Sequence, residues 1–434
     1  MAARSTQILS IHRLNDSSKA QSIPDWWTAE KIKGSPEVAA IETAAEYLRN
    51  SDIPVGFPTE TVYGLGADAT RSTAVQGIYR AKQRPSDNPL IVHVDSIDRI
   101  ESLLSGQHVT NGTKPASTIP SIYRPLISRF WPGPLTIILP NPPNSPLAKE
   151  VTAGLSTFGV RMPASPFARL LIYVTDRPLA APSANASTKP SPTTAQHVYH
   201  DLKGRIDIIL DGGPSGVGVE STVVDGLSNP PSILRPGGVG IDEIRACPGW
   251  ENATIAYEDN AMNYIKETPR APGMKYRHYS PKAKVILFEA GTAVSGVCER
   301  ISRDIETKTL GIQSVGIIKT KIWTKEFNLS LRLKDHALHT PISSFTLNVD
   351  MDGHTNEDAP KPTLNSKSTS PLVIYEVLLG QTPESIAHGL FSALRTLDSK
   401  EVDVIYIEGI PDNDGDLAAA VMNRLRKAAI EIER

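Results

Sequence analysis

Over residues 37 to 245, short apolar runs rich in β-branched residues alternate with stretches whose apolar side chains recur every three or four positions. The short runs predict strands, and the longer spacing predicts helices with one buried face. Ile41, Ala44 and Leu48 show this spacing in a helix predicted over 37–50. Further helices are predicted at 73–82 and 122–131, and strands at 54–57, 90–94, 135–139, 158–162, 179–181, 206–210, 221–224 and 232–234. Many strands with few helices indicate an α/β domain built on a large twisted mixed sheet.

A second alternation begins at residue 285 and continues to the end of the chain. It predicts strands at 285–288, 315–319 and 404–408 and helices at 383–397 and 416–430. We therefore expect a smaller Rossmann-like α/β domain over 284–434. Within it, residues 336–370 are rich in Ser, Thr, Asn, Asp and Pro, which predicts a disordered insertion.

Residues 246–283, between the two alternations, lack apolar periodicity. They contain Pro248, Pro269, Pro272 and Pro281. This composition predicts a long linker, and linkers of this length in compact proteins are often functional. We expect four parts in the chain: an N-terminal extension over 1–36, a first domain over 37–245, the linker, and the second domain over 284–434.

The charge balance is close to neutral. The 434 residues include 45 Lys and Arg against 47 Asp and Glu, a net charge of −2. Charge alone therefore predicts at most weak direct RNA binding. Cys247 and Cys298 are the only cysteines and lie too far apart for a CxxC zinc cluster, which favours an intracellular, reduced protein.

The start of the chain bears on where the protein resides. It lacks the apolar core of a secretory signal, and no apolar run is long enough to span a membrane, so we expect a cytoplasmic protein without a membrane partner. Arg4, His12 and Arg13 leave open a transit peptide and a minor mitochondrial pool. Asp16 and the strand-like residues 6–11 favour an ordinary first strand instead.

Lys82 and Arg84 lie at the predicted end of a helix, just before Pro85. On a continuous helix the two side chains would diverge, because neighbours on one face are three or four residues apart. Pro85 disfavours helical geometry at Arg84, so we expect the chain to leave the helix near Gln83. Both cations can then converge on one anion such as a triphosphate. The segment alone fits equally well a simpler role, in which cations gather where the helix macrodipole favours them.

Three further strings place hydroxyls, amides and glycines at predicted strand ends. They are FPTETVYGLG at 57–66, APSAN at 181–185 and GGPSGVGVEST at 212–222. Such groups suit phosphate or ribose, although each string alone also fits a capped turn. Walker A, GxGxxG and GxSxG motifs are absent, so neither the common nucleotide-binding folds nor a serine hydrolase is indicated.

The order of the motifs narrows these alternatives. The chain carries in sequence PTETVYGLG, KxRPxxNPL with His93 after it, Arg161-Met162-Pro163, APSAN, ESTVVD and Leu234-Arg235-Pro236-Gly237. Over about residues 37–240 it thereby resembles the YrdC-like threonylcarbamoyl-adenylate synthases. The string PGMKYRHYSP at 272–281 resembles the linker of the long, two-domain members.

This resemblance implies a nucleotidyltransferase. It would join L-threonine, bicarbonate and ATP into threonylcarbamoyl-adenylate and release pyrophosphate, with Mg²⁺ held through ATP and not by direct protein ligands. A downstream tRNA threonylcarbamoyl transferase would use the product to modify the adenosine beside the anticodon in tRNAs that read codons starting with A.

The resemblance also implies the residues of the site. The L-threonine site is implied at Thr61, His93, Arg161, Ala181 and Ser221. The ATP site is implied at Lys82, Arg84, Asn88, Thr157, Ser183, Asn185, Ser191, Arg235 and Tyr276, with Lys82 and Arg84 as the catalytic pair. The linker around Tyr276 is expected to cover the nucleotide. Arg161 suits a carboxylate through bidentate pairing, the alternative being a structural salt bridge.

Two other functions are weighed against this one. A double-stranded RNA-binding module without catalysis is disfavoured by the near-neutral charge and by the lack of interleaved aromatic and cationic residues. A carbamoyl-transfer enzyme for metallocentre assembly shares the YrdC-like unit but carries zinc-finger cysteine pairs, which this chain lacks.

Overall fold

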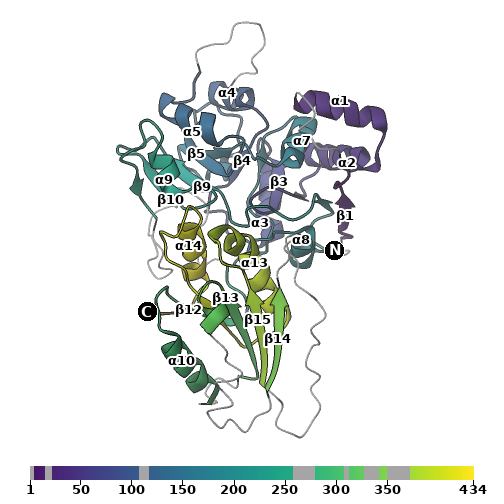
Figure 1. Cartoon of the computed structure of the whole chain (residues 1–434). Helices are drawn as coiled ribbons and strands as arrows, with labels where there is room; N and C mark the ends of the chain where they lie inside the picture. The colour runs from purple at the N-terminus through teal and green to yellow at the C-terminus, as the bar shows by residue number, and fades with distance from the viewer. Residues whose placement is uncertain are drawn as a thin grey trace. The chain divides into compact units, whose positions relative to one another are not determined.

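A computed structural model describes residues 4–14, 22–106, 117–257, 279–306, 312–326, 342–348 and 372–434 (Figure 1). Contacts divide the chain into two compact units. The first unit holds the described residues up to 257, apart from 188–190. The second unit holds residues 188–190 and the described residues from 279 onward. Among the described residues, no helix combines the length and apolar character needed to cross a membrane.

An eleven-stranded mixed sheet forms the centre of the first unit. Its order is β1-β8-β2-β3-β7-β4-β6-β5-β9-β10-β11. The strands are β1 Gln7–Ser10, β2 Val55–Phe57, β3 Gly64–Asp68, β4 Ile91–His93, β5 Leu135–Pro140, β6 Thr157–Arg161, β7 Leu179–Ala180, β8 Ile208–Asp211, β9 Thr222–Asp225, β10 Ser232–Arg235 and β11 Thr254–Ile255. Parallel pairs such as β4 with β6 and antiparallel pairs such as β5 with β6 both occur. The large mixed sheet expected from the sequence is thus confirmed.

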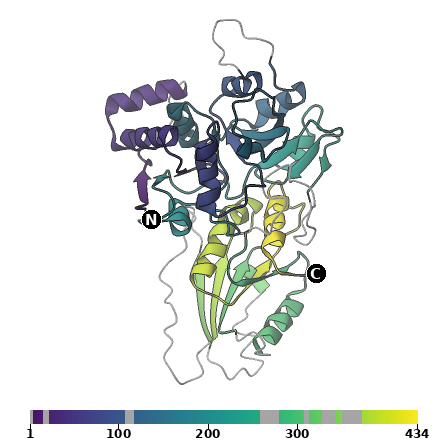
Figure 2. The same cartoon turned by 180° about the vertical axis from the view of Figure 1, so that it is seen from behind.

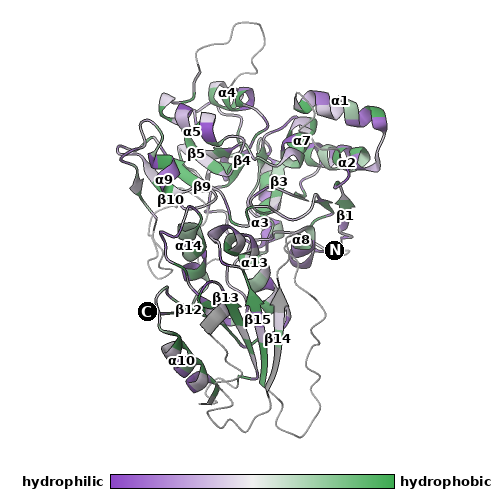
Figure 3. Cartoon of the chain, in the orientation of Figure 1, coloured by the Kyte–Doolittle hydropathy of each residue, from purple (hydrophilic) through white to green (hydrophobic). Residues whose placement is uncertain are grey.

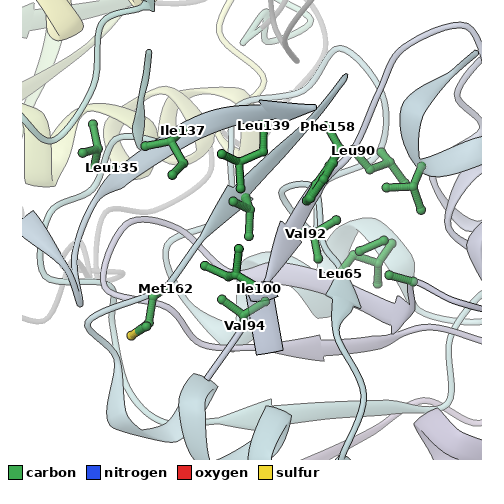
Figure 4. Packing of buried hydrophobic residues seen from close by; sticks show 14 of the residues in the cluster. Leu65, Leu90, Val92, Val94, Ile100, Leu135, Ile137, Leu139, Phe158 and Met162 are labelled. Atoms are coloured by element: carbon green, nitrogen blue, oxygen red, sulfur yellow. The ribbon is translucent and has the colours of Figure 1, made fainter. Parts of the chain in front are cut away.

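Helices cover this sheet, and buried residues form two large hydrophobic clusters in this unit. The helices are α1 Ile23–Lys33, α2 Pro36–Asn50, α3 Ser72–Lys82, α4 Ile97–Ser105, α5 Arg124–Phe130, α6 Lys149–Thr152, α7 Pro166–Thr175, α8 Ala195–Leu202 and α9 Ile241–Arg245, with a 3-10 turn at Ser121–Tyr123. Alternate residues of β4 and β5, such as Leu135 and Ile137, pack into the larger cluster with Phe158 and Ile100 (Figure 4). The predicted apolar face of α2 is buried in the smaller cluster.

The segments flanking the predicted first domain are built into it. β1 pairs in parallel with β8, and α1 buries Trp26 and Trp27 in the smaller cluster, so the described part of residues 1–36 belongs to this unit. On the other side, Trp250 is fully buried in the larger cluster and its indole N–H donates to the carbonyl oxygen of Ile122 (2.9 Å). The chain therefore remains part of the first core for some distance beyond residue 245.

The second unit contains a six-stranded sheet in the order β14-β15-β13-β16-β12-β17, with every neighbouring pair parallel. Its elements are β12 Lys284–Phe288, α10 Val294–Glu306, β13 Ser314–Lys319, α11 Trp323–Glu326, β14 Ile342–Asn348, β15 Leu372–Leu378, α13 Pro383–Ser399, β16 Val404–Glu408, α14 Ala418–Ala428 and β17 Glu431–Glu433. Helices α13 and α14 lie side by side, yellow-green and yellow in Figure 2. Strands β13 and β16 are buried along nearly their whole length and largely hydrophobic (Figure 3). This confirms a parallel α/β domain, although its strand order is not the usual Rossmann order.

One expectation for this unit was wrong in part. The insertion predicted over 336–370 contains strand β14, which pairs along its length with β15. The hydrogen bonds of a parallel strand come from its neighbour, so a polar composition does not exclude pairing. The other residues of the predicted insertion lie outside the described part of the chain.

Candidate active site

Helix α3 ends where the prediction placed its end, at the two cations. Gln83 takes a left-handed conformation (φ 54°), and the N–H groups of Gln83 and Arg84 bond to the carbonyl oxygens of Arg80 and Tyr79. This is the hydrogen-bond pattern of a Schellman motif, with Gln where Gly is usual. Leaving the helix at Gln83 is therefore confirmed, so Lys82 is the last helical residue and Arg84 lies beyond the helix.

Lys82 is only 2% exposed, and its ammonium group contacts two other predicted ATP residues. It donates to the carbonyl oxygens of Ser183 (2.5 Å) and Asn185 (2.6 Å) and lies 3.3 Å from the amide Oδ1 of Asn185. The Ser183 hydroxyl donates to the same Oδ1 atom at 2.5 Å. Lys82 of the KxR motif and the APSAN segment thus form one polar network.

Asn88 is fully buried, and neither polar atom of its side chain has a hydrogen-bond partner in the described part of the chain. Its backbone carbonyl oxygen accepts from the Tyr79 hydroxyl at 2.9 Å, which fixes the loop after α3. A buried amide left without partners costs on the order of 1–3 kcal/mol. Such a group is well suited to a ligand that supplies both a donor and an acceptor.

Arg161, at the end of β6, is held by three acceptors. Its Nε donates to the carbonyl oxygen of Gly133 (3.1 Å), its Nη1 to the hydroxyl of Thr61 (2.8 Å), and its Nη2 to the carboxylate of Glu60. Burial favours a raised pKa for Glu60, but the charge of Arg161 and hydrogen bonds outweigh it and lower that pKa. The salt bridge considered as the alternative role of Arg161 is therefore present.

His93 ends β4 and is in register with Arg161 on the neighbouring strand. Burial, with a smaller contribution from the Arg161 charge, lowers the pKa of His93 to about 3, so the ring is neutral at neutral pH. Its Nδ1 lies 3.3 Å from the carbonyl oxygen of Ile91, which assigns the proton to Nδ1 and leaves Nε2 as an acceptor. The ring also packs edge-on against Phe57.

Ser221, predicted for threonine, contacts Arg235, predicted for ATP. Its carbonyl oxygen accepts from Nε (3.1 Å) and Nη2 (2.9 Å) of Arg235, and its hydroxyl lies 2.8 Å from the Thr136 hydroxyl. The backbone of Gly237 packs directly against that of residues 220–222. A Cβ atom at Gly237 would lie 2.3 Å from backbone atoms of these residues. Only glycine permits this approach.

Backbone contacts place the threonine and ATP sets next to each other. Gly64 forms a bridge with Ser183, and the N–H of Ala184 donates to the carbonyl oxygen of Tyr63 (2.8 Å). Earlier in the PTETVYGLG motif, the carbonyl oxygen of Thr61 accepts from the N–H of Gly218 (3.1 Å), in the Gly-rich loop. The PTETVYGLG segment thus contacts both the APSAN segment and the Gly-rich loop.

The remaining described residues predicted for the site have no contact with the Lys82 network or with Arg161 among those given above. Ala181 bonds through its N–H to Ile91 (2.9 Å), and Ser191 donates to the carboxylate of Glu220 (2.5 Å). Thr157 begins β6, about 13 Å along the strand from Arg161. Tyr276 lies outside the described residues, as does most of the predicted lid.

Sequence reasoning missed three residues that contact the predicted ones: the partly buried Glu60 and the buried Thr136 and Glu220. A signal existed for both glutamates, because each is a charged residue inside a motif otherwise made of small and apolar residues. Thr136 gave none, since a threonine within a strand is ordinary. Among the described residues, no three His, Cys, Asp or Glu side chains are grouped to hold a metal ion.

Comparison with known proteins covers both units. One family model, described as telomere recombination, matches residues 47–237, and another, described as threonylcarbamoyl-AMP synthase C-terminal domain, matches 239–430. The threonylcarbamoyl-AMP synthase of Schizosaccharomyces pombe is 44% identical, over 98% of this chain and 96% of its own length. That of Bacillus subtilis is 40% identical, over 93% of this chain and 95% of its own length. A crystal structure of P. abyssi Sua5 complexed with L-threonine is 36% identical, covers 99% of each chain and gives a TM-score of 0.71.

Proposed function

The chain belongs to the threonylcarbamoyl-AMP synthase family in its two-domain form, and on that premise we propose that the Lys82 network binds ATP beside an L-threonine site at Arg161. Family membership makes the chain an enzyme of threonylcarbamoyl-adenylate synthesis, a nucleotidyltransferase step in tRNA modification. The RNA-binding alternative is not favoured, because both units match this enzyme family.

The observation that carries the proposal is the direct contact between the two sets of residues. Arg235, assigned to ATP, bonds to Ser221, assigned to threonine, and Gly64 of the threonine motif pairs with Ser183 of the ATP motif. A carbamate formed on threonine would therefore lie beside the nucleotide. Orienting two reactants in this way can supply roughly 7–11 kcal/mol of the barrier.

We assign the threonine site to Thr61, His93, Arg161, Ala181 and Ser221. The neutral amine of threonine attacks the carbon of bicarbonate, and water leaves to give the carbamate. Arg161 would bind the threonine carboxylate, while the neutral His93 offers Nε2 as an acceptor. The Thr61 hydroxyl accepts from Arg161, which supports a role for it beside the bound threonine.

We assign the ATP site to Lys82, Arg84, Asn88, Thr157, Ser183, Asn185, Ser191 and Arg235, with Tyr276 of the linker covering the nucleotide. A carbamate oxygen attacks the α-phosphorus, and the bond to pyrophosphate breaks. Lys82, Arg84 and Arg235 are the cations that would stabilise charge on the leaving group. Mg²⁺ would add to this neutralisation and is proposed to be held mainly by the ATP phosphates, as is usual for this ion.

The product would pass to a tRNA threonylcarbamoyl transferase. An activated carbamate is short-lived in water, which favours a location where both enzymes and the tRNA meet. We propose the cytoplasm as that location, with a minor mitochondrial pool.

Pyrophosphate release measured with each component omitted in turn tests the function. Release should require ATP, L-threonine and bicarbonate together, and mass spectrometry should detect threonylcarbamoyl-adenylate. Equal release with serine or other amino acids would contradict the substrate assignment. A salt-sensitive RNA complex without pyrophosphate release would favour the binding module instead.

A further inference from the structure

Glu60 is a partly buried carboxylate at the threonine end to which the proposed reaction gives no role. Its side chain is 15% exposed, and one carboxylate oxygen pairs with Nη2 of Arg161. The other oxygen accepts the backbone N–H of Ser165 at 3.2 Å, beside the start of α7. The backbone carbonyl oxygen of Glu60 accepts from Val217 at 2.7 Å. Glu60 is therefore fixed at both its backbone and its side chain.

The donors of Arg161 show what this fixation achieves. An arginine has five N–H donors, and in the described structure three of them go to Gly133, Thr61 and Glu60. One N–H on Nη1 and one on Nη2 remain. Two such donors match the two oxygens of a carboxylate, provided that the guanidinium plane is held in place.

Each of the three acceptors constrains a different nitrogen, and Glu60 alone is charged. Without it, only the Gly133 carbonyl and the Thr61 hydroxyl would orient the guanidinium, and a buried cation would lack its counter-ion. Glu60 also offsets the charge of Arg161, so affinity for a carboxylate would depend on the alignment of the two remaining donors more than on net attraction.

We propose that Glu60 is a positioning residue that aligns the two remaining N–H groups of Arg161 with the carboxylate of L-threonine and so sets the preference for a free α-carboxylate. This inference rests on the proposed function, because it takes L-threonine as the ligand. It assigns to Glu60 no contact with the reacting atoms.

The Glu60→Gln variant tests this role, because glutamine keeps the size of the side chain but loses the ion pair with Arg161. Its amide oxygen can accept from Arg161, but its NH₂ group then faces the N–H of Ser165, donor against donor. Calorimetry would measure binding of L-threonine and of L-threoninamide, which lacks the carboxylate. We expect Glu60→Gln to weaken L-threonine binding about 10- to 100-fold while L-threoninamide changes little, so that the discrimination ratio falls. In kinetics, KM for L-threonine should rise with kcat and KM for ATP nearly unchanged.

Controls separate this role from a merely structural one. The exposed Glu42→Gln, on α2, is the matched variant and should bind both ligands like the wild type. If Glu60→Gln does not fold, Glu60→Asp keeps the charge but shortens the reach, and its discrimination ratio should also fall. An unchanged ratio, or parallel loss of L-threonine, L-threoninamide and ATP binding, would overturn the inference. If the wild type itself does not bind L-threonine, the proposed function fails first.

Discussion

The Nζ atom of Lys82 lies 2.6 Å from the carbonyl oxygen of Asn185, 103 positions further along the chain. The ammonium group is thus held by backbone acceptors of the APSAN segment, and Lys82 is almost fully buried. A charge so fixed needs no reorganisation when charge develops on a nearby phosphate, which is the condition for strong electrostatic catalysis.

Lys82→Met should lower the rate of pyrophosphate release by about 10²–10³-fold, the usual effect of removing one preorganised donor. Methionine preserves most of the volume, so the thermal midpoint should change far less than activity. Lys203→Met, at an exposed lysine after α8, is the matched control and should retain wild-type rates. A Lys82→Met protein with near-normal turnover would exclude a role for this ammonium.

Asn88→Leu should stabilise the protein without ligand and weaken ATP binding. The wild-type amide is buried without partners, so an apolar side chain of similar size removes a penalty of about 1–3 kcal/mol. Thermal melting with and without ATP checks both effects, since the midpoint should rise without ATP while the ATP-induced shift disappears. Asn50→Leu, at an exposed position ending α2, should preserve the ATP-induced shift. Retention of the full shift in Asn88→Leu would contradict ligand binding by this amide.

His93 should make the protein less stable in mild acid. Its pKa is about 3 in the folded state against about 6.5 in the unfolded chain, so below pH 6.5 only the unfolded chain takes up the proton. The free energy of unfolding should therefore fall by up to about 1.4 kcal/mol per pH unit between pH 6 and pH 4, and this loss should be absent above pH 7. Urea unfolding of the wild type and of His93→Gln at several pH values measures how much of this loss in the free energy of unfolding depends on His93. Parallel pH profiles for the two proteins would show that His93 is not the cause.

Truncation should distinguish the first core from the segment that follows it. A chain ending at residue 245 loses Trp250, a fully buried side chain, and should be destabilised by at least about 3–5 kcal/mol. A chain ending at 257 keeps Trp250 and strand β11 and should unfold cooperatively near the midpoint of the first unit in the full protein. Only the longer fragment can test a covering role of the linker, because loss of activity in the shorter one would follow from its damaged core. Equal stability of the two fragments would contradict the placement of Trp250.

Local pattern was sufficient for much of the fold and for the proposal of a site. The predicted apolar face of α2 is buried, and the helix ends before Arg84 because Pro85 restricts that residue. These features depend on side chains only a few positions apart, which a sequence displays directly. The order of motifs likewise indicated the segments of the proposed site, although it gave no distances between them.

The sequence by itself determined many of the elements, the two α/β units and the family. Only the tertiary structure decided that Arg161 pairs with Glu60, that Lys82 is held by Ser183 and Asn185, and that residues 342–348 form a strand. The reason is physical: burial periodicity is a property of neighbouring residues, whereas a hydrogen bond between positions 60 and 161 depends on how distant strands pack. A glutamate inside a motif looks the same in sequence whether it binds substrate, solvent or an arginine, and folding decides among these.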